Sequence, residues 1–195
     1  MDDSDLIIVI VFIFGFLLII IAFSNKKEPE VKRKKVTDRP DLIQDDKVTM
    51  KLVEEKIDGF KIFVNPKRKI GFTEKDVQIE LESFLKDIFQ NVTREHGVES
   101  KNAKAIDFDI GNGKVGIEVK LAVEIFKEGG WDRAIGQMVK YTRLKYNNEN
   151  LIFLVAGFEE DLRNSMLSEF EDDVYQNKCQ FKFVSAGSKK QIKNN

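Results

Sequence analysis

Ala105 to Lys120 read AIDFDIGNGKVGIEVK, and this stretch decides the fold. Apolar and polar residues alternate on both sides of a Gly-Asn-Gly segment, which predicts two strands, over 104–110 and 114–121, joined by a tight turn. Asn112-Gly113 favours a two-residue hairpin turn, because both central positions of that turn need a positive φ. The stretch therefore predicts an antiparallel β-hairpin.

The turn also predicts which residues face each other across the hairpin. Counting outward from it places Phe108 opposite Ile117 and Asp107 opposite Glu118, with Lys120 on the same face as Glu118. Opposed Cβ atoms lie about 4.5–5.5 Å apart, so two carboxylates there repel unless a cation lies between them. We interpret Asp107 and Glu118 as candidate ligands of a divalent metal.

A second acid, Asp109, is expected on the same face as Asp107, whereas Ile106 and Phe108 face the other way. Asp109 would lie opposite Gly116 with no acidic partner, so it is the weaker candidate. The alternative for the whole face is the exposed polar side of an edge hairpin, which is common. The opposed acids argue against this alternative, because they lower stability unless they have a function.

The rest of the chain predicts a mixed α/β sheet flanked by helices. Thr73-Glu74-Lys75-Asp76 has the pattern of a capping box and predicts a helix that ends near 90–91. Before it, 48–57 fits a helix or a strand, and 60–64 and 70–72 fit two short strands. After it we expect a strand over 92–98, the hairpin, a helix over 132–146, a buried strand over 151–156, a polar helix over 159–171 and a strand over 181–184.

Composition limits the chemistry. The 195 residues carry a formal net charge of −1, so the chain as a whole has no excess of positive charge with which to bind nucleic acid. Any binding of nucleic acid would need a local basic patch. Cys179 is the single cysteine and His96 the single histidine, which excludes a cysteine-based zinc site. We expect Cys179 to be a packed residue and His96 a surface residue. Metal ligands would then be carboxylates, which suit Mg or Mn.

The N-terminus predicts a membrane anchor. Leu6 to Phe23 is uncharged and, at about 1.5 Å per helical residue, nearly spans the roughly 30 Å core of a bilayer. Acidic residues precede it and a basic run follows it, which favours a retained single-pass helix, with the rest of the chain in the cytoplasm, over a cleaved signal or a core helix. The predicted organisation is an anchor over 1–24, a charged linker over 25–46, a domain over 47–187 and a polar tail over 188–195.

The hairpin residues resemble a known superfamily. Asp107 followed by Glu118-Val119-Lys120 is similar to the motif of the PD-(D/E)xK nucleases, which include restriction endonucleases, Holliday-junction resolvases and RecB-like nucleases. Ile106 stands where the motif names proline, which many members lack. The resemblance covers about 73–156 and implies a restriction-endonuclease-like fold.

The resemblance also implies roles for these residues. Asp107, Glu118 and the carbonyl of Val119 would hold Mg (or Mn), and Lys120 would position and deprotonate the attacking water. Glu80, on the preceding helix, resembles the helical acid of the metal site. Glu82, at the other edge of the same apolar face, is the competing candidate, and the sequence leaves the two open.

The helix after the hairpin carries Gln137 and Tyr141, which resemble the QxxxY motif of RecB-like members. The resemblance implies that this pair, with Arg133 one turn earlier, positions the nucleic acid; ordinary helix surface is the alternative. Trp131 fits base stacking less well than packing at the helix start. Further cations that fit phosphate contacts or a solvated helix face equally well are Lys140, Arg143 and Lys145.

These observations predict a membrane-anchored, metal-dependent nuclease that hydrolyses phosphodiester bonds. The resemblance favours DNA, and the residues themselves do not distinguish DNA from RNA. Two alternatives stay open: a non-catalytic nucleic-acid-binding module that kept the fold, and a membrane-tethered interaction protein. Many members of the superfamily act as dimers, so a homodimer is a further expectation from the resemblance alone.

Overall fold

The computed structural model describes residues 41–62, 64, 71–97, 105–147 and 149–187. They form a five-stranded sheet in the order β1-β2-β3-β4-β5. The hairpin β2–β3 and the pair β1–β2 are antiparallel, and β3–β4 and β4–β5 are parallel, so the predicted mixed sheet is confirmed. The strands are β1 Val92–Gly97, β2 Ala105–Ile110, β3 Val115–Leu121, β4 Leu151–Gly157 and β5 Gln180–Ser185.

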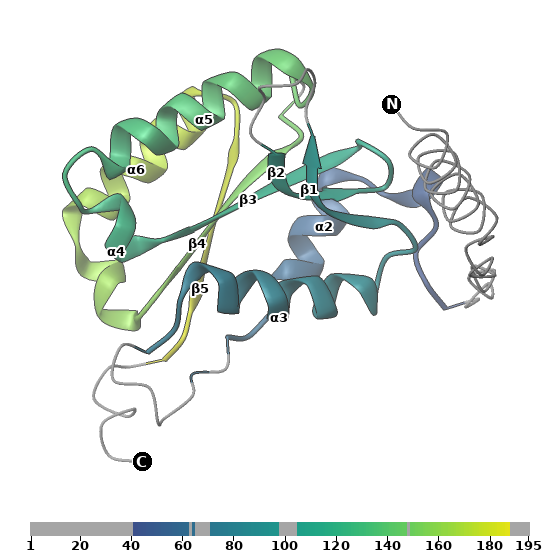
Figure 1. Cartoon of the computed structure of the whole chain (residues 1–195), viewed down its shortest axis with the longest axis horizontal. Helices are drawn as coiled ribbons and strands as arrows, with labels where there is room; N and C mark the ends of the chain where they lie inside the picture. Colours follow the sequence, from purple (N-terminus) through teal and green to yellow (C-terminus); the bar gives the residue numbers. More distant parts are fainter. Residues whose placement is uncertain (1–40, 63, 65–70, 98–104, 148, 188–195) are drawn as a thin grey trace, which may run out of the picture. The chain divides into compact units, whose positions relative to one another are not determined.

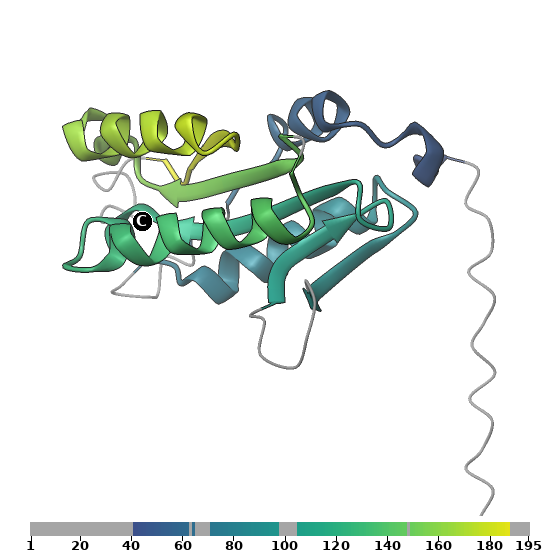
Figure 2. The same ribbon diagram turned by 90° about the horizontal axis from the view of Figure 1, so that it is seen from above.

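Helices cover both faces of this sheet (Figures 1 and 2). On one face lie α2 and α3, and on the other lie α4, α5 and α6. The predicted order of helix, three strands, helix, strand, helix and strand is confirmed, with α2 and α4 added. The helices are α2 Met50–Ile57, α3 Glu74–Lys86, α4 Ala122–Ile125, α5 Gly130–Leu144 and α6 Ser165–Gln176, and the 3-10 turns are η1 Asp45–Lys47 and η2 Glu159–Arg163.

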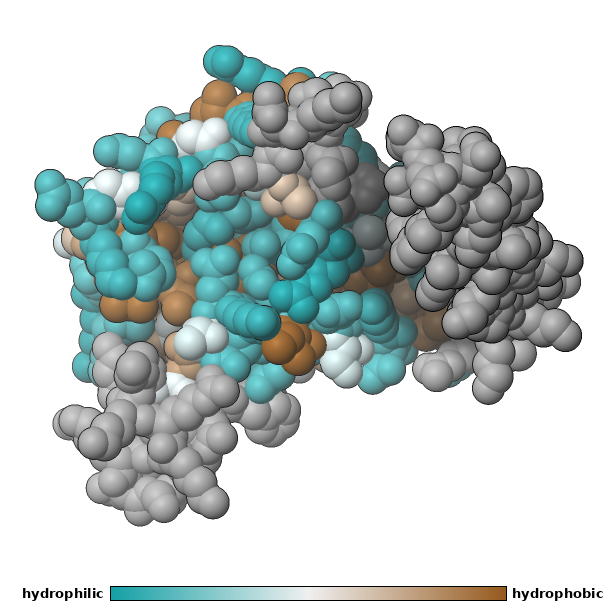
Figure 3. Space-filling view, viewed as in Figure 1, coloured by the Kyte–Doolittle hydropathy of each residue, from teal (hydrophilic) through white to brown (hydrophobic). Residues whose placement is uncertain are grey.

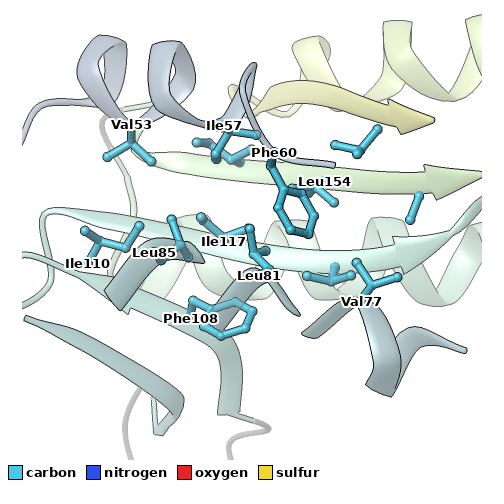
Figure 4. Packing of buried hydrophobic residues seen from close by; sticks show 14 of the residues in the cluster. Val53, Ile57, Phe60, Val77, Leu81, Leu85, Phe108, Ile110, Ile117 and Leu154 are labelled. Carbon is cyan, nitrogen blue, oxygen red and sulfur yellow. The ribbon is translucent and has the colours of Figure 1, made fainter. Parts of the chain in front are cut away.

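Two apolar clusters hold the layers together. In Figure 4, Leu81 and Leu85 of α3 pack with Phe108 and Ile117 of the hairpin. The opposite face of the sheet packs against α5 and α6. Successive residues of β4 alternate between the two clusters and all are buried, which confirms a central strand covered on both faces.

The start of α3 confirms the predicted capping box. Thr73 Oγ1 accepts a hydrogen bond from the backbone of Asp76, and Asp76 accepts one from the backbone of Thr73. The helix ends at Lys86, before the predicted 90–91. The reason is Ile43, whose backbone bonds to Ile88 O and Gln90 N and so draws that segment out of the helix. Residues 41–46, expected in the linker, therefore contribute to this unit.

Three local predictions differ from the structure. Thr49 caps residues 50–57 as a helix, which resolves their ambiguity. The described residues of 60–64 and 70–72 are in neither helix nor strand, so the two short strands are wrong there. The helix expected over 159–171 is split into η2 and α6, because Asn164 Oδ1 accepts from Met166 N and starts a new helix.

The predicted anchor at 6–23, the linker up to residue 40 and the tail at 188–195 lie outside the described residues. Among the helices that are described, none combines the length and the hydropathy needed to cross a membrane.

Candidate active site

The predicted hairpin register is confirmed next to the turn. Phe108 pairs with Ile117, and Asn112 and Gly113 have φ values of 56° and 93°. Regular pairing between β2 and β3 ends at Phe108, one pair before the expected pair of Asp107 with Glu118. The two strands therefore separate at the point where the candidate acids lie.

This separation frees one peptide group of β3. Gly116 N donates to Asn150 O on the β4 side, so by alternation the N–H and C=O of Val119 point toward β2. The side chain of Asp107 replaces the missing backbone partner, and Val119 N donates to Asp107 Oδ2 over 2.7 Å. The Val119 carbonyl is left pointing into the same gap.

The strand alternation also breaks at Asp107, which corrects an expectation. Ile106 packs in the cluster on the α5 side, whereas Phe108 packs in the cluster on the α3 side. Across the sheet from Asp107, Glu95 of β1 has a φ of 53°, outside the extended region. Asp107 and Asp109 therefore do not share a face, because the backbone of β2 is irregular between Ile106 and Phe108.

Glu118 is a buried carboxylate with one unsatisfied oxygen. Its Oε1 accepts from Lys120 Nζ over 2.7 Å, and its Oε2 is buried with no hydrogen-bond partner among the described residues. The pKa of Glu118 is raised to about 7, chiefly by burial. The charge of Asp107 contributes to this rise, and the charge of Lys120 opposes it. Burying a charge without full compensation is unfavourable, so ionised Glu118 lowers the stability of the folded protein.

Lys120 lies between oxygen atoms of Glu118, Val119 and Glu74. Its Nζ donates to Glu118 Oε1 and, over 3.1 Å, to Val119 O, and it lies 3.9 Å from Glu74 Oε2. Burial alone would lower the pKa of Lys120, but the surrounding carboxylates of Glu118, Glu74 and Asp107 outweigh it and raise the pKa. The ammonium contacts two of the oxygens that the sequence assigned to a cation.

Gln78 of α3 connects the two strands to the helix. Its Nε2 donates to Asp107 Oδ1 over 2.9 Å and to Glu74 Oε1 over 3.3 Å. Its Oε1 accepts from Arg94 Nη2 over 3.1 Å, so Arg94 determines which end of the amide faces the acids. Burial raises the pKa of Asp107, and the hydrogen bonds from Val119 and Gln78 lower it in part.

The acid of α3 that lies beside Lys120 is Glu74, whereas the sequence pointed to Glu80 or Glu82. Burial raises the pKa of Glu74, and it faces Lys120 and Asp107. Glu82 forms ion pairs with Lys86 and Arg94 instead. Glu80 is two residues after Gln78, so it projects from the far side of α3, since residues two apart do not share a helix face.

The QxxxY pair of α5 lies beside Glu118. Tyr141 is fully buried and donates to Ala105 O over 3.2 Å. Burial raises the pKa of Tyr141, and the charges of Glu118 and Asp107 raise it further, as does the approach of its hydroxyl to the Glu118 carboxylate, which stops short of a hydrogen bond of ordinary length and angle. Gln137 and Arg133 line the same cavity as Lys120. The structure thus brings the three α5 residues to the candidate site.

Several other residues that the sequence singled out have structural partners, and one has its side chain outside the described residues. Asp109 is buried and accepts from Lys145 Nζ, Tyr146 Oη and Gly113 N, each over 2.6 Å. Lys145 therefore pairs with Asp109 and not with Asp107 or Glu118.

Trp131 donates to Asp173 and packs edge-on against Phe170, which confirms packing over base stacking. Cys179 is buried, as expected, and the side chain of His96 lies outside the described part.

The residues present fit a divalent cation. No group of three or more His, Cys, Asp or Glu side chains among the described residues is arranged as a metal cage. Mg²⁺ does not need one, because it is usually bound by one or two carboxylates with water and substrate phosphates. The unsatisfied Oε2 of Glu118, the carboxylate of Asp107 and the Val119 carbonyl form such a partial set.

Sequence reasoning missed Glu74, Gln78 and Arg94. Glu74 and Gln78 are four residues apart directly after the helix cap, so a polar stripe on the face toward the hairpin was a detectable signal. The contribution of Arg94 depends on how β1 pairs with β2, which the sequence alone does not indicate.

No protein-family model, no curated protein and no solved structure matches the chain.

Proposed function

We propose that this protein is a divalent-metal-dependent nuclease of the PD-(D/E)xK type that hydrolyses phosphodiester bonds, with DNA as the substrate that the resemblance favours. The observation that carries the proposal is Glu118, a buried carboxylate beside Lys120 with one oxygen unpartnered among the described residues. A fold optimised only for stability would replace it, because an incompletely paired buried acid is destabilising.

In this proposal, Asp107, Glu118 and the carbonyl of Val119 hold Mg²⁺ or Mn²⁺, and Glu74 lies at the edge of the set. Bound there, the cation would make water more acidic and offset the negative charge of the phosphate. Gln78 keeps Asp107 oriented toward the gap between the strands. Tyr141 closes the α5 side of Glu118 and so excludes bulk water.

We assign Lys120 two roles, one before and one after a metal ion binds. Its ammonium now neutralises Glu118, and a cation at Glu118 would displace it toward the cavity that it lines. There, once a nearby cation lowers its pKa and it releases a proton to solvent, the neutral amine would position the attacking water and take up its proton, and the ammonium so formed would stabilise the charge that develops on the phosphate. Arg133 and Gln137, also on the cavity wall, would contact the neighbouring phosphates.

The test is cleavage of a panel of DNA and RNA substrates by the full chain in detergent, with Mg²⁺, Mn²⁺ or EDTA. Lys120→Ala is the inactivating variant. Lys182→Ala is the matched control, because Lys182 is also a strand lysine that pairs with one carboxylate, Asp58, over 2.9 Å. We expect metal-dependent cleavage that Lys120→Ala abolishes and Lys182→Ala retains.

Three results would contradict the proposal. One is the absence of cleavage of every DNA and RNA form. Another is cleavage that persists in EDTA, and the third is equal loss in both lysine variants. Binding of nucleic acid without cleavage would support the alternative of a non-catalytic module.

We also propose that residues 6–23 anchor the protein in a membrane, with the nuclease domain on the cytoplasmic side. The support is the apolar stretch and the basic run after it. Membrane fractionation and protease accessibility in intact cells test this. Recovery in the soluble fraction with the N-terminus removed would contradict it.

A further inference from the structure

A cavity of about 1160 Å³ opens beside Lys120. Its walls come from the N-terminus of α3, from α4, from α5 and from the end of β4, so it is continuous with the candidate active site. On the side of the molecule where α4 lies, apolar side chains show between polar ones in Figure 3. The cavity is large enough for more than a phosphate group.

One wall of the cavity is apolar and partly exposed. Val123 of α4 is 56% exposed, although it is an aliphatic residue next to the catalytic candidates. Phe72 and Phe158, which also line the cavity, form a tilted ring pair with centroids 5.4 Å apart, and Leu121 and Phe126 are further apolar lining residues. Apolar surface at the side of a charged site indicates a ligand with an apolar part.

The cavity lining also carries charges of both signs, with the acids Glu74, Glu124 and Asp161 beside four cations, Lys120, Lys127, Arg133 and Lys140. Arg133 and Lys140 lie on the α5 side of the cavity with Gln137 between them. Within the described residues neither cation has an acidic partner, whereas Lys127 is paired with Glu124 over 2.6 Å. Cations without an acidic partner and apolar side chains in one cavity match a ligand that carries both phosphates and flat rings.

The faces of a base are covered by its neighbours in a duplex, so only an unstacked base can contact the apolar wall. We propose that this cavity binds an unpaired nucleotide, and that the substrate is therefore single-stranded nucleic acid: a free strand, an overhang or a flap. The inference rests on the proposed function for the position of the scissile phosphate at Lys120. The base lies against Val123 and the aromatic pair, and its phosphates face Arg133 and Lys140.

Binding is measured by fluorescence anisotropy with the full chain in detergent and EDTA, so that hydrolysis does not interfere. The probes are a short single-stranded DNA, the blunt duplex of the same sequence, and a strand of equal length that lacks bases. The variant is Val123→Ser. Its matched control is Leu162→Ser, because Leu162 is 54% exposed and does not line the cavity.

We expect the single strand to bind about tenfold more tightly than either the duplex or the strand without bases, since base stacking contributes roughly 1–3 kcal/mol per base. Val123→Ser should weaken single-strand binding about fivefold and leave duplex binding unchanged. Leu162→Ser should change neither. Equal binding of the single strand and the duplex, or equal losses in the two serine variants, would overturn the inference.

The two proposals fail in different ways. Cleavage of blunt duplexes without preference for unpaired DNA contradicts the cavity assignment and leaves the nuclease proposal standing. Single-strand binding that depends on Val123, with no cleavage in Mg²⁺ or Mn²⁺, contradicts the nuclease and supports the cavity assignment.

Discussion

Asp107 and Asp109 are two residues apart on β2, yet their surroundings are opposite in kind. Asp109 is buried where the hairpin is regular, and three donors, Lys145, Tyr146 and Gly113, satisfy it. Asp107 lies where β2 leaves β3, beside Glu118, whose Oε2 has no partner among the described residues. Asp109 is thus held within the fold, whereas Asp107, which is only partly buried, lies at the candidate site.

The difference lies in the neighbours of each acid. Both oxygens of Asp107 accept hydrogen bonds, from Gln78 and Val119, but the acid beside it, Glu118, keeps one oxygen without a partner among the described residues. A satisfied buried carboxylate holds elements together, and removing it leaves its donors unpaired. An unsatisfied one costs stability and is available to a cation or substrate. Substitutions at the two acids and at their lysine partners should consequently affect different properties.

The largest expected effect separates the two lysines. Lys120→Met should lower the rate of metal-dependent cleavage about 10³-fold, because it removes the group placed to handle the proton and the phosphate charge. Lys145→Met should leave the rate per folded molecule within a few-fold, because Lys145 contacts Asp109. Single-turnover rates, normalised to the folded fraction from circular dichroism, measure both.

If Lys145→Met lost cleavage as severely as Lys120→Met at equal folded fraction, the assignment of Asp109 to structure alone would be wrong.

The next largest effect is on the stability of the protein when either aspartate of β2 is substituted. Asp109→Asn should lower the free energy of unfolding by about 2–3 kcal/mol, because it leaves Lys145 and Tyr146 without a charged acceptor in a buried setting. Asp107→Asn should change it by less than about 1 kcal/mol. Urea unfolding curves in EDTA measure the pair, and a larger loss for Asp107→Asn would reverse the comparison.

Glu118 should carry a measurable stability cost that depends on pH. Its pKa in the folded state is raised to about 7 from an ordinary 4.5, so the folded state binds this proton more tightly than the unfolded state. The stabilisation from that proton is complete below the unfolded value and is lost as pH rises through about 7. Glu118→Gln removes this loss.

The variant should therefore be more stable than the natural protein near pH 8 in EDTA, by about 1–2 kcal/mol after its weaker contact with Lys120 is counted. The advantage should shrink toward pH 5. Thermal unfolding at the two pH values, with Mn²⁺ added in a parallel series, measures it. A variant that is less stable at pH 8, or a difference that does not change with pH, would contradict the cost assigned to Glu118.

The hairpin and the alternating strands could be predicted because side-chain alternation and the Asn112-Gly113 turn are local properties. The break in β2 could not, because it arises where Asp107 replaces a backbone partner of Val119, a tertiary event. The end of α3 was missed for the same reason, since Ile43 comes from a distant part of the chain. The proximity of Glu74 to Lys120 was missed because apolar periodicity defines a buried face and not which polar edge meets the hairpin.

The smallest expected effect concerns the acids of α3. Glu74 and Gln78 are one turn apart; Gln78 donates to Asp107 and Glu74 lies 3.9 Å from Lys120, whereas Glu80 is about 200° around the helix from Gln78. Glu74→Gln should weaken Mn²⁺ binding and cleavage about tenfold, as is usual when a group around a metal ligand is neutralised.

Glu80→Gln is the matched control on the same helix and should stay within about twofold. Isothermal titration with Mn²⁺ gives a readout that is independent of cleavage. If Glu80→Gln weakened Mn²⁺ binding more than Glu74→Gln, the metal would have to lie on the far side of α3 from Asp107. The strand separation would then have a structural origin, and the difference between Asp107 and Asp109 would lose its functional meaning.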